Sequence, residues 1–216
     1  TCALPIFCST GLDNSTITGD YTIGIKSEWL SLVGDVFGRY ISGISGDYLF
    51  HSVPYYSMSE EDLELEEFNK LGEQASQGCV RLAVSDAKWV YDNCPTGTNV
   101  SIYDDAGNAG PLGKPDAIKI TDFTNKWDPT DSNKKCPYAK ATPIISGAND
   151  YTIKSGGEFY ALAGVTAVDT CGNDITSNIE VFGNVITTRK GKYKVTYSVT
   201  DVLKRTSSVT ITVTVQ

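Results

Sequence analysis

Strict two-residue alternation near the C-terminal end is the feature that most constrains the fold of this chain. In residues 192–199, tyrosine and valine alternate with lysine, threonine and serine, and residues 209–215 repeat the pattern with valine and isoleucine against threonine. Successive side chains of a β-strand point to opposite faces, so each segment predicts a strand with one buried and one exposed face. Such strands are typical of an antiparallel sheet.

Closely spaced turn signals divide the residues around these two strands, and each signal contains glycine. They are Ser155-Gly156-Gly157, Cys171-Gly172-Asn173-Asp174, Gly183-Asn184 and Lys190-Gly191. Short strands separated in this way predict an antiparallel β-sandwich. A polar, turn-rich stretch over residues 127–137 precedes it. We therefore place a junction near 138–142, between one domain over residues 1–138 and a second over residues 143–216.

The first domain has a mixed pattern. Alternation predicts strands over residues 21–25, 46–51 and 100–104. A helix is predicted over residues 59–71, where a serine can cap the first turn and acidic residues fill it. A second helix is predicted over residues 85–92, since a proline shortly afterwards prevents its continuation.

The composition supports packed cores and excludes two classes of partner. Hydrophobic residues make up 40% of the 216 residues and charged residues 20%, which argues against disorder. A formal net charge of −8 gives no basic footprint for nucleic acid or for an anionic membrane surface. No apolar run is long enough to span a membrane. The first residues lack the basic start of a secretory signal, so we expect a fragment of a longer precursor.

Six cysteines are present, and none of their spacings is typical of metal ligation. His51 is the only histidine, which argues against a Cys/His zinc site, and we expect neither a metal nor a cofactor. Disulfides between Cys94 and Cys136 or between Cys2 and Cys8 stay open as alternatives. The preferred interpretation of most of the cysteines is that they are small buried hydrophobic side chains.

Cys79 is the strongest candidate for a nucleophile. A glycine precedes it, which allows backbone N–H groups to converge on a developing oxyanion, and Arg81 follows, where it could bind a carboxylate. A catalytic thiol also needs a base, and His51 is the only residue of its type. Taken alone, one cysteine and one histidine are more often a buried thiol and a hydrogen-bonded imidazole than a catalytic pair.

The order of the surrounding motifs favours the catalytic interpretation of Cys79 and His51. Along the chain, these motifs are Ser9-Thr10-Gly11, a turn and strand over 16–23, Phe50-His51-Ser52, Ser76-Gln77-Gly78-Cys79, a helix and strand over 86–102, and Trp127-Asp128-Pro129-Thr130-Asp131. In this order, over nearly all of residues 1–138, the chain resembles the YkuD-type L,D-transpeptidases. The final segment is similar to a tail common in Gram-positive members. The resemblance implies a β-sandwich of the L,D-transpeptidase type with short helices.

The resemblance also implies catalytic roles. Cys79 would be the nucleophile and His51 the general base, with the backbone carbonyl of Ser52 orienting the imidazole. Backbone N–H groups of Gly78 and Cys79 would form the oxyanion hole. Arg81 would contact the donor stem peptide.

Ser76 and Gln77 complete the expected substrate-binding set, and Gln77 departs from the family pattern. A second histidine usually stands at this position, and glutamine can hydrogen-bond but cannot titrate. The chain also begins inside the pattern, so that the usual opening β-hairpin is expected to be missing before Thr1. These departures keep open a non-catalytic wall-binding or adhesive protein as an alternative.

By resemblance, the reaction is cross-linking of peptidoglycan. The family attacks the bond between residue three of a donor stem peptide and D-Ala at position four, and an amine of an acceptor stem then gives a 3→3 cross-link. Water as the acceptor would make the same site an L,D-carboxypeptidase. Carbapenem-type β-lactams are expected to be covalent inhibitors, and peptidoglycan stems to be the partners.

Two further segments have functional interpretations. An acidic run over residues 60–73 would lie over the cleft as a lid, and it either attracts substrate amines or is a solvated helix face, which we favour. Residues 143–216 resemble the bacterial immunoglobulin-like modules of surface proteins, which are usually spacers or adhesive units. Both parts imply an extracellular or cell-wall location.

Overall fold

The computed structural model describes residues 5–105, 107 and 113–216, and it separates into two compact units, Thr1–Ala139 and Lys140–Gln216. Strands dominate both units, which confirms the mainly β fold expected from the sequence. Short 3-10 helices connect some of them: η1 (Leu12–Asn14), η2 (Pro137–Lys140) and η3 (Thr176–Asn178).

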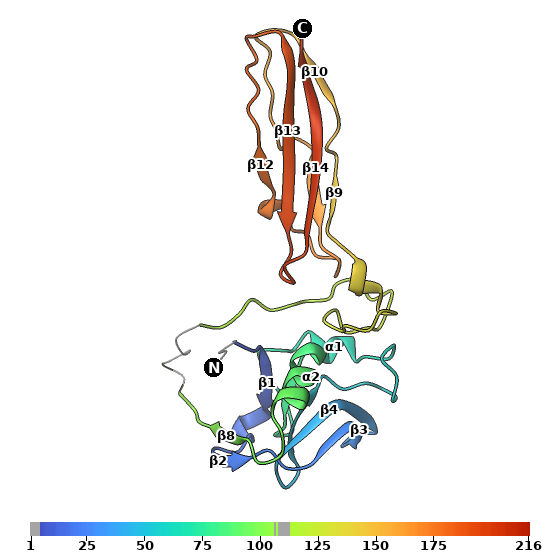
Figure 1. Ribbon diagram of the computed structural model, residues 1–216, viewed down its shortest axis with the longest axis vertical. Helices are drawn as coiled ribbons and strands as arrows, with labels where there is room; N and C mark the ends of the chain where they lie inside the picture. The colour runs from blue at the N-terminus through green and yellow to red at the C-terminus, as the bar shows by residue number, and fades with distance from the viewer. Residues whose placement is uncertain (1–4, 106, 108–112) are drawn as a thin grey trace. The chain divides into compact units, whose positions relative to one another are not determined.

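Short strands frame the first unit: β1 (Cys8–Gly11), β2 (Gly19–Thr22), β3 (Lys26–Leu32), β4 (Val36–Ser45), β5 (Tyr48–Ser52), β6 (Gln74–Ser76), β7 (Val80–Leu82) and β8 (Asn99–Ile102). Six of them form one sheet in the order β3-β4-β5-β7-β1-β6, and β2 pairs with β8 (Figure 1). β5 and β7 run parallel. The three strands predicted in this unit correspond to β2, β5 and β8, with shifted ends.

The β3–β4 hairpin lies outside the strands that the sequence predicts. Its turn uses Gly34 and Asp35 at φ values of 95° and 56°, in the left-handed region that glycine and aspartate tolerate best. Tyr40 has a positive φ of 55° inside β4. The N–H of the neighbouring Arg39 donates to Ser52 Oγ at 2.9 Å. Next to the irregular backbone at Tyr40, β4 is therefore linked to β5 by a hydrogen bond to the Ser52 side chain.

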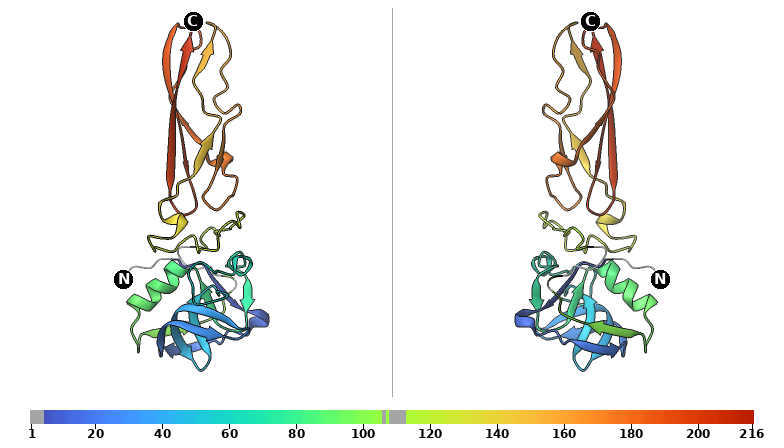
Figure 2. Two further views of the ribbon diagram at one scale, coloured as in Figure 1. Left: turned by 90° about the vertical axis from the view of Figure 1, so that its right-hand side faces the viewer. Right: turned by 90° about the vertical axis from the view of Figure 1, so that its left-hand side faces the viewer.

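The α-helix α2 (Val84–Asn93) packs against β4, β5 and β7, and Figure 2 shows it beside the sheet. The helix predicted over residues 85–92 is thus confirmed. At its C-terminal end, Lys26 Nζ donates to the carbonyls of Tyr91 and Cys94. A cation at this end of a helix is favourable because the last carbonyls are otherwise unpaired.

The acidic segment over residues 59–71 forms much less helix than its sequence predicts. The helix α1 covers only Leu65–Phe68, so the longer prediction is wrong. Tyr55 and Leu63 form an antiparallel bridge, and the Leu63 N–H donates to the Lys126 carbonyl at 2.9 Å. These bonds fix the backbone of Leu63, and residues 56–61 before it form bends and a turn, so no helix begins before Leu65.

A buried carboxylate from the 127–131 segment caps the N-terminus of α2. Asp128 is fully buried, and its Oδ2 accepts the Val84 N–H at 2.8 Å. Its Oδ1 accepts the Thr130 N–H at 2.8 Å and the Thr130 hydroxyl at 2.6 Å. Burial raises the pKa of Asp128 to about 6, against the opposing effect of these hydrogen bonds. Asp131 also pairs with Arg39 of β4 at 3.1 Å. The 127–131 segment is therefore an integral part of the first unit.

The second unit is built on two long strands, β13 (Gly191–Thr200) and β14 (Thr206–Val215), which pair antiparallel along their whole length. Buried or half-buried valine, tyrosine and isoleucine side chains alternate with more exposed lysine, threonine and serine, which confirms the predicted alternation. The flanking strands are β9 (Ile144–Ser146), β10 (Tyr151–Ile153), β11 (Thr166–Val168) and β12 (Glu180–Phe182). The sheets are β10-β14-β13-β12 and β11-β9. β10 joins β14 in parallel, which departs from the antiparallel pairing expected.

Within the described residues, Cys8, Cys79, Cys94, Cys136 and Cys171 are free thiols. The alternative of a disulfide between Cys94 and Cys136 is therefore wrong. Cys2 lies outside the described residues.

Asp128→Ala should lower the free energy of unfolding of the first unit by about 2 kcal/mol, because the buried Val84 N–H and the half-buried Thr130 N–H lose their acceptor. All three tryptophans lie in this unit, so urea unfolding followed by tryptophan fluorescence reports on it selectively. Asp122→Ala is the matched control, since Asp122 accepts the Thr124 N–H at 2.9 Å on the exposed surface. We expect less than about 0.5 kcal/mol there, and equal effects of the two substitutions would contradict the cap.

Candidate functional site

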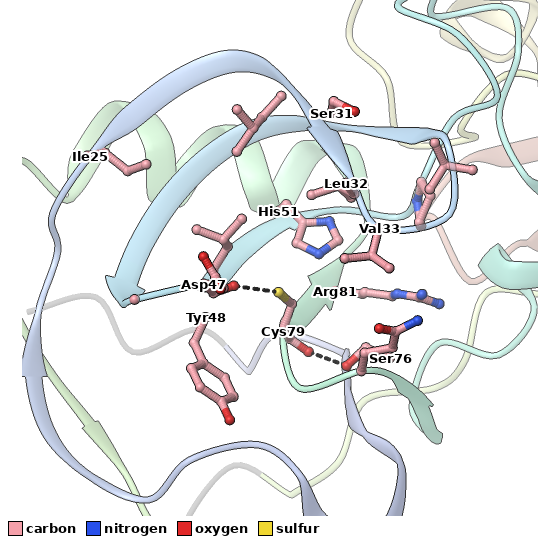
Figure 3. Close-up of a pocket in the computed structure, with 16 residues that line it drawn as sticks. Ile25, Ser31, Leu32, Val33, Asp47, Tyr48, His51, Ser76, Cys79 and Arg81 are labelled. Carbon is pink, nitrogen blue, oxygen red and sulfur yellow. Dashed lines mark hydrogen bonds between the residues drawn. The ribbon is translucent and has the colours of Figure 1, made fainter.

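Strands β5 and β7 bring the candidate catalytic side chains onto one face of the sheet. The strands run parallel with His51 opposite Arg81. Cys79 precedes Arg81 by two residues, so its side chain points to the same face. All three residues line one pocket of about 470 Å³. Figure 3 shows the Cys79 sulfur in this pocket, with the His51 ring and the Arg81 side chain around it.

The His51 ring is held in one tautomer by the backbone of its own strand. Its Nδ1 lies 2.6 Å from the Ser52 carbonyl oxygen, and because a carbonyl can only accept, Nδ1 carries the proton and Nε2 is left as an acceptor. The next N–H, that of Val53, donates to the Leu82 carbonyl of β7 at 2.8 Å. The peptide that orients His51 is thus fixed by the strand that follows Cys79.

Burial determines the charge state of His51. The side chain is 2% exposed, and desolvation lowers its pKa to about 4, with a smaller contribution in the same direction from Arg81 and an opposing one from the Ser52 hydrogen bond. A Cβ at Gly38 of β4 would lie 3.1 Å from Nδ1, so a glycine at this position leaves room for the ring. At neutral pH, His51 is an uncharged base.

Cys79 is a protonated thiol in the resting site. Its Sγ lies 3.4 Å from the Asp47 carbonyl oxygen, which accepts the thiol proton. Burial raises the pKa of this thiol, the Leu49 N–H and Arg81 oppose that effect, and Asp47 adds to it. A neutral thiol and a neutral imidazole therefore face the same pocket, without an ion pair between them.

A rigid turn presents Cys79. Gly78 has a φ of 136°, which favours glycine, and a Cβ there would lie 2.7 Å from the Tyr48 ring. The buried Ser76 hydroxyl accepts the Gly78 N–H at 3.0 Å and donates to the Cys79 carbonyl at 2.6 Å. The Thr16 hydroxyl donates to the Gly78 carbonyl at 2.8 Å. The Gly78 N–H, expected in the oxyanion hole, is thus paired with Ser76 in the resting protein.

Arg81 has an internal partner in addition to its place in the pocket. Its Nη1 pairs with Glu67 of α1, and its side chain is 16% exposed. The same carboxylate also pairs with Lys70. Arg81 was expected to bind a substrate carboxylate, and that group would have to compete with Glu67.

The rest of the acidic segment does not form a lid. No residue of 59–73 lines the pocket. Glu60 pairs with Arg39 at 3.1 Å, and Asp62 pairs with Lys126 at 3.2 Å. The expectation of an acidic lid over the cleft is therefore wrong, because these carboxylates bind cations of the same unit instead.

Two parts of the pocket were missed by reasoning from the sequence. The β3–β4 hairpin supplies an apolar wall with Leu30, Leu32 and Val36, the turn between β4 and β5 supplies Asp47, and the start of β5 supplies Tyr48. The Gly34-Asp35 pair was a sequence signal for the hairpin. Nothing in the local sequence pointed to Asp47, whose place depends on the pairing of β4, β5 and β7. Gln77 and Ser76 do lie at the pocket, as expected from their position next to Cys79.

No group of three or more histidine, cysteine, aspartate or glutamate side chains is arranged to hold a metal ion within residues 5–105, 107 and 113–216.

Two family models match the chain. The model of the L,D-transpeptidase catalytic domain, YkuD, matches residues 3–102, and the model of the bacterial surface protein Ig-like domain matches residues 143–215. Among curated proteins, YciB of Bacillus subtilis (strain 168), assigned by name as an L,D-transpeptidase, is 49% identical over 57 residues. This match covers 26% of the chain and 28% of the relative.

Several solved structures are similar to parts of the chain. A fused Zn-dependent amidase/peptidase/peptidoglycan-binding domain-containing protein of Clostridium acetobutylicum is 35% identical over 44% of this chain and 38% of its own, with a TM-score of 0.33. An L,D-transpeptidase of Stackebrandtia nassauensis is 20% identical over 46% and 44%, with a TM-score of 0.36. LdtMt1 in complex with imipenem is 18% identical over 45% and 48%, with a TM-score of 0.37. The chain spans less than half the length of each of these relatives.

Alkylation of Cys79 should follow the pH profile of a protonated thiol. Because burial raises the pKa of Cys79, the rate with iodoacetamide should increase with pH through an inflection above about 8.5, the value of an ordinary cysteine. No inflection should occur near 6.5, since the pKa of His51 is lowered to about 4. Peptide mapping by mass spectrometry gives the rate at Cys79 alone. An inflection below about pH 7 would indicate a thiolate–imidazolium pair and contradict this assignment.

Proposed function

We propose that this chain forms 3→3 cross-links in peptidoglycan through a thioester at Cys79, since residues 3–102 match the L,D-transpeptidase catalytic domain, YkuD, and residues 143–215 match the bacterial surface protein Ig-like domain. The observation that supports this best is the shared pocket of Cys79 and His51, with the imidazole held by Ser52 so that Nε2 is free to accept a proton. We further propose residues 1–138 as the catalytic domain and residues 143–216 as the Ig-like domain.

In the first half-reaction, His51 Nε2 takes the proton of the Cys79 thiol as the sulfur attacks the carbonyl carbon of residue three of the donor stem. The carbonyl π bond opens to an oxyanion, to which the Cys79 N–H donates. Gly78 can contribute a second N–H only if it releases Ser76. When the carbonyl re-forms, the bond to D-Ala breaks, and the departing amine takes the proton from His51. The products are free D-Ala and a thioester.

In the second half-reaction, an amine of an acceptor stem attacks the thioester carbon and gives its proton to His51. The tetrahedral intermediate expels the Cys79 thiolate, which recovers that proton from the imidazolium. One amide has been broken and one formed, so no oxidant or external energy source is required. Attack by water in place of the amine would release the donor tripeptide, which is carboxypeptidase chemistry at the same site.

Burial of the pair has a direct consequence for these steps. An imidazolium at His51 is destabilised by desolvation, so it exists only while charge develops on the substrate. The Ser52 carbonyl, 2.6 Å from Nδ1, partly offsets that cost because it accepts the Nδ1 proton. The proton is therefore returned readily to the leaving group in each half-reaction.

The remaining pocket residues have supporting roles in this proposal. Ser76 fixes the turn that presents Cys79 through its two backbone hydrogen bonds. Gln77 is exposed at the pocket and offers its amide to substrate in place of the histidine usual at this position. Arg81 contacts the donor stem from its position beside Glu67.

The Ig-like part is consistent with action at the bacterial surface, where we propose that it serves as a spacer or adhesive unit. Among the described residues, no helix combines the length and the apolar character needed to cross a membrane. Carbapenems are proposed as covalent inhibitors, because a strained β-lactam carbonyl can acylate the thiol that the proposal assigns to the donor stem.

Cys79→Ala should abolish release of D-Ala from a tetrapeptide donor, formation of the cross-linked dimer, and the mass adduct with imipenem, because the variant has no nucleophile. Liquid chromatography with mass spectrometry measures all three. Cys94→Ala is the matched control, since Cys94 is a free thiol that does not line the pocket, and it should retain all three activities.

An imipenem adduct or D-Ala release that persists in Cys79→Ala would contradict the assignment. If the wild-type protein releases the tripeptide but forms no cross-linked dimer when the acceptor amine is present, it is a carboxypeptidase. No product and no adduct in the wild type would favour the non-catalytic surface protein.

A further inference from the structure

The turn between β4 and β5 places an acidic residue beside the candidate nucleophile. Asp47 lines the same pocket as Cys79, and its carbonyl oxygen is 3.4 Å from the Cys79 sulfur. Figure 3 shows the residue directly next to that sulfur. Asp47 is exposed, so its side chain is accessible from solvent at the pocket that holds Cys79.

The charged groups that line the pocket differ in their ion-pair partners. Arg81 is paired with Glu67, and His51 is neutral at pH 7. Asp47 has no ion-pair partner among the described residues. Its charge also acts on the sulfur, since it contributes to the raised pKa of the Cys79 thiol. In the part of the chain that the structure describes, Asp47 is therefore the one carboxylate that lines this pocket, and its charge opposes that of Arg81 at the Cys79 sulfur.

We propose that Asp47 is an ammonium-binding, specificity-determining residue of this cleft, which recognises the side-chain ammonium group of a diamino acid in a stem peptide. The inference rests on the proposed function and adds the chemical group that the pocket selects. The same charge disfavours a free carboxylate near Cys79, and the pairing of Arg81 with Glu67 weakens the opposing attraction. Stems whose acidic groups are amidated should therefore be favoured over stems with free carboxylates.

Two ammonium groups could occupy this subsite. The donor residue that becomes attached to Cys79 carries one on its side chain, and the acceptor stem brings another to the thioester. For the acceptor, Asp47 would increase the affinity of the site for the protonated amine. It would not increase the rate of aminolysis itself, because the amine must lose its proton before it attacks the thioester. The chemistry of recognition is the same in both cases, and separate arms of the experiment distinguish them.

The first experiment needs no enzymatic turnover. Cys79 is modified with a cationic reagent, 2-aminoethyl methanethiosulfonate, and with an anionic one, 2-sulfonatoethyl methanethiosulfonate, and the rates are compared at one pH and low salt. Asp47→Asn should slow the cationic reagent and speed the anionic one, each by about three- to tenfold, as expected when one charge is removed from the wall of the same pocket. Taking the ratio of the two rates removes any common change in thiol reactivity.

Glu61→Gln is the matched control for this ratio. It removes the same charge from an exposed side chain of the acidic segment, which does not line the pocket. The ratio should stay within about twofold of the wild type there, and Asp47→Glu should retain most of the wild-type preference. A ratio unchanged in Asp47→Asn, or changed equally by Glu61→Gln, would overturn the proposal.

The second experiment identifies the source of the ammonium group. Acylation of Cys79 is measured with donor tetrapeptides that carry lysine or Nε-acetyl-lysine at position three, and aminolysis with Nα-acetyl-lysinamide or with the neutral nucleophile hydroxylamine. Asp47→Asn should selectively slow either the lysine donor or the lysinamide acceptor by about three- to tenfold, and spare the neutral counterpart. Equal effects on charged and neutral partners would overturn the proposal. If the wild type forms no acyl-enzyme, the proposed function fails, whereas the reagent ratio still reports on Asp47.

Discussion

The peptide group between Ser52 and Val53 is the constraint on which the rest of this site depends. Its carbonyl accepts the His51 Nδ1 proton, and its N–H donates to Leu82 of β7. One rigid group therefore sets the tautomer of the base and the register between β5 and β7, the strand that Cys79 immediately precedes. The Ser52 side chain adds a third link, since its hydroxyl oxygen accepts the Arg39 N–H of β4.

Around this peptide, the first unit uses buried polar groups to fix backbone rather than to bind ligands. Asp128 caps α2 from a segment distant in sequence, and the Ser76 hydroxyl closes the turn before Cys79. Such groups are costly to bury unless each finds a partner. Because these buried groups form hydrogen bonds with backbone N–H and C=O groups, they hold a site made from short strands and loops in one geometry.

Some of this could be predicted from the sequence, and the limits have physical causes. Alternation along β13 and β14 predicts these strands because each strand buries one face. The motif around Cys79 can be recognised because its residues are consecutive in the sequence. The helix over residues 59–71 fails because the Lys126 carbonyl competes for the backbone of Leu63. Asp47 could not be found, since its nearness to Cys79 arises only when three strands pair. The pairing of Arg81 with Glu67 was missed for the same reason, as it joins two distant elements.

In the proposed reaction, the donor stem acylates Cys79. The most direct test is to quench a reaction of the wild-type protein with a tetrapeptide donor during turnover and to map the adduct by mass spectrometry. We expect a tripeptide acyl group on the peptide that contains Cys79, and hydroxylamine should release it as it does a thioester. Turnover of the donor with no adduct, or with the adduct on another residue, would contradict it.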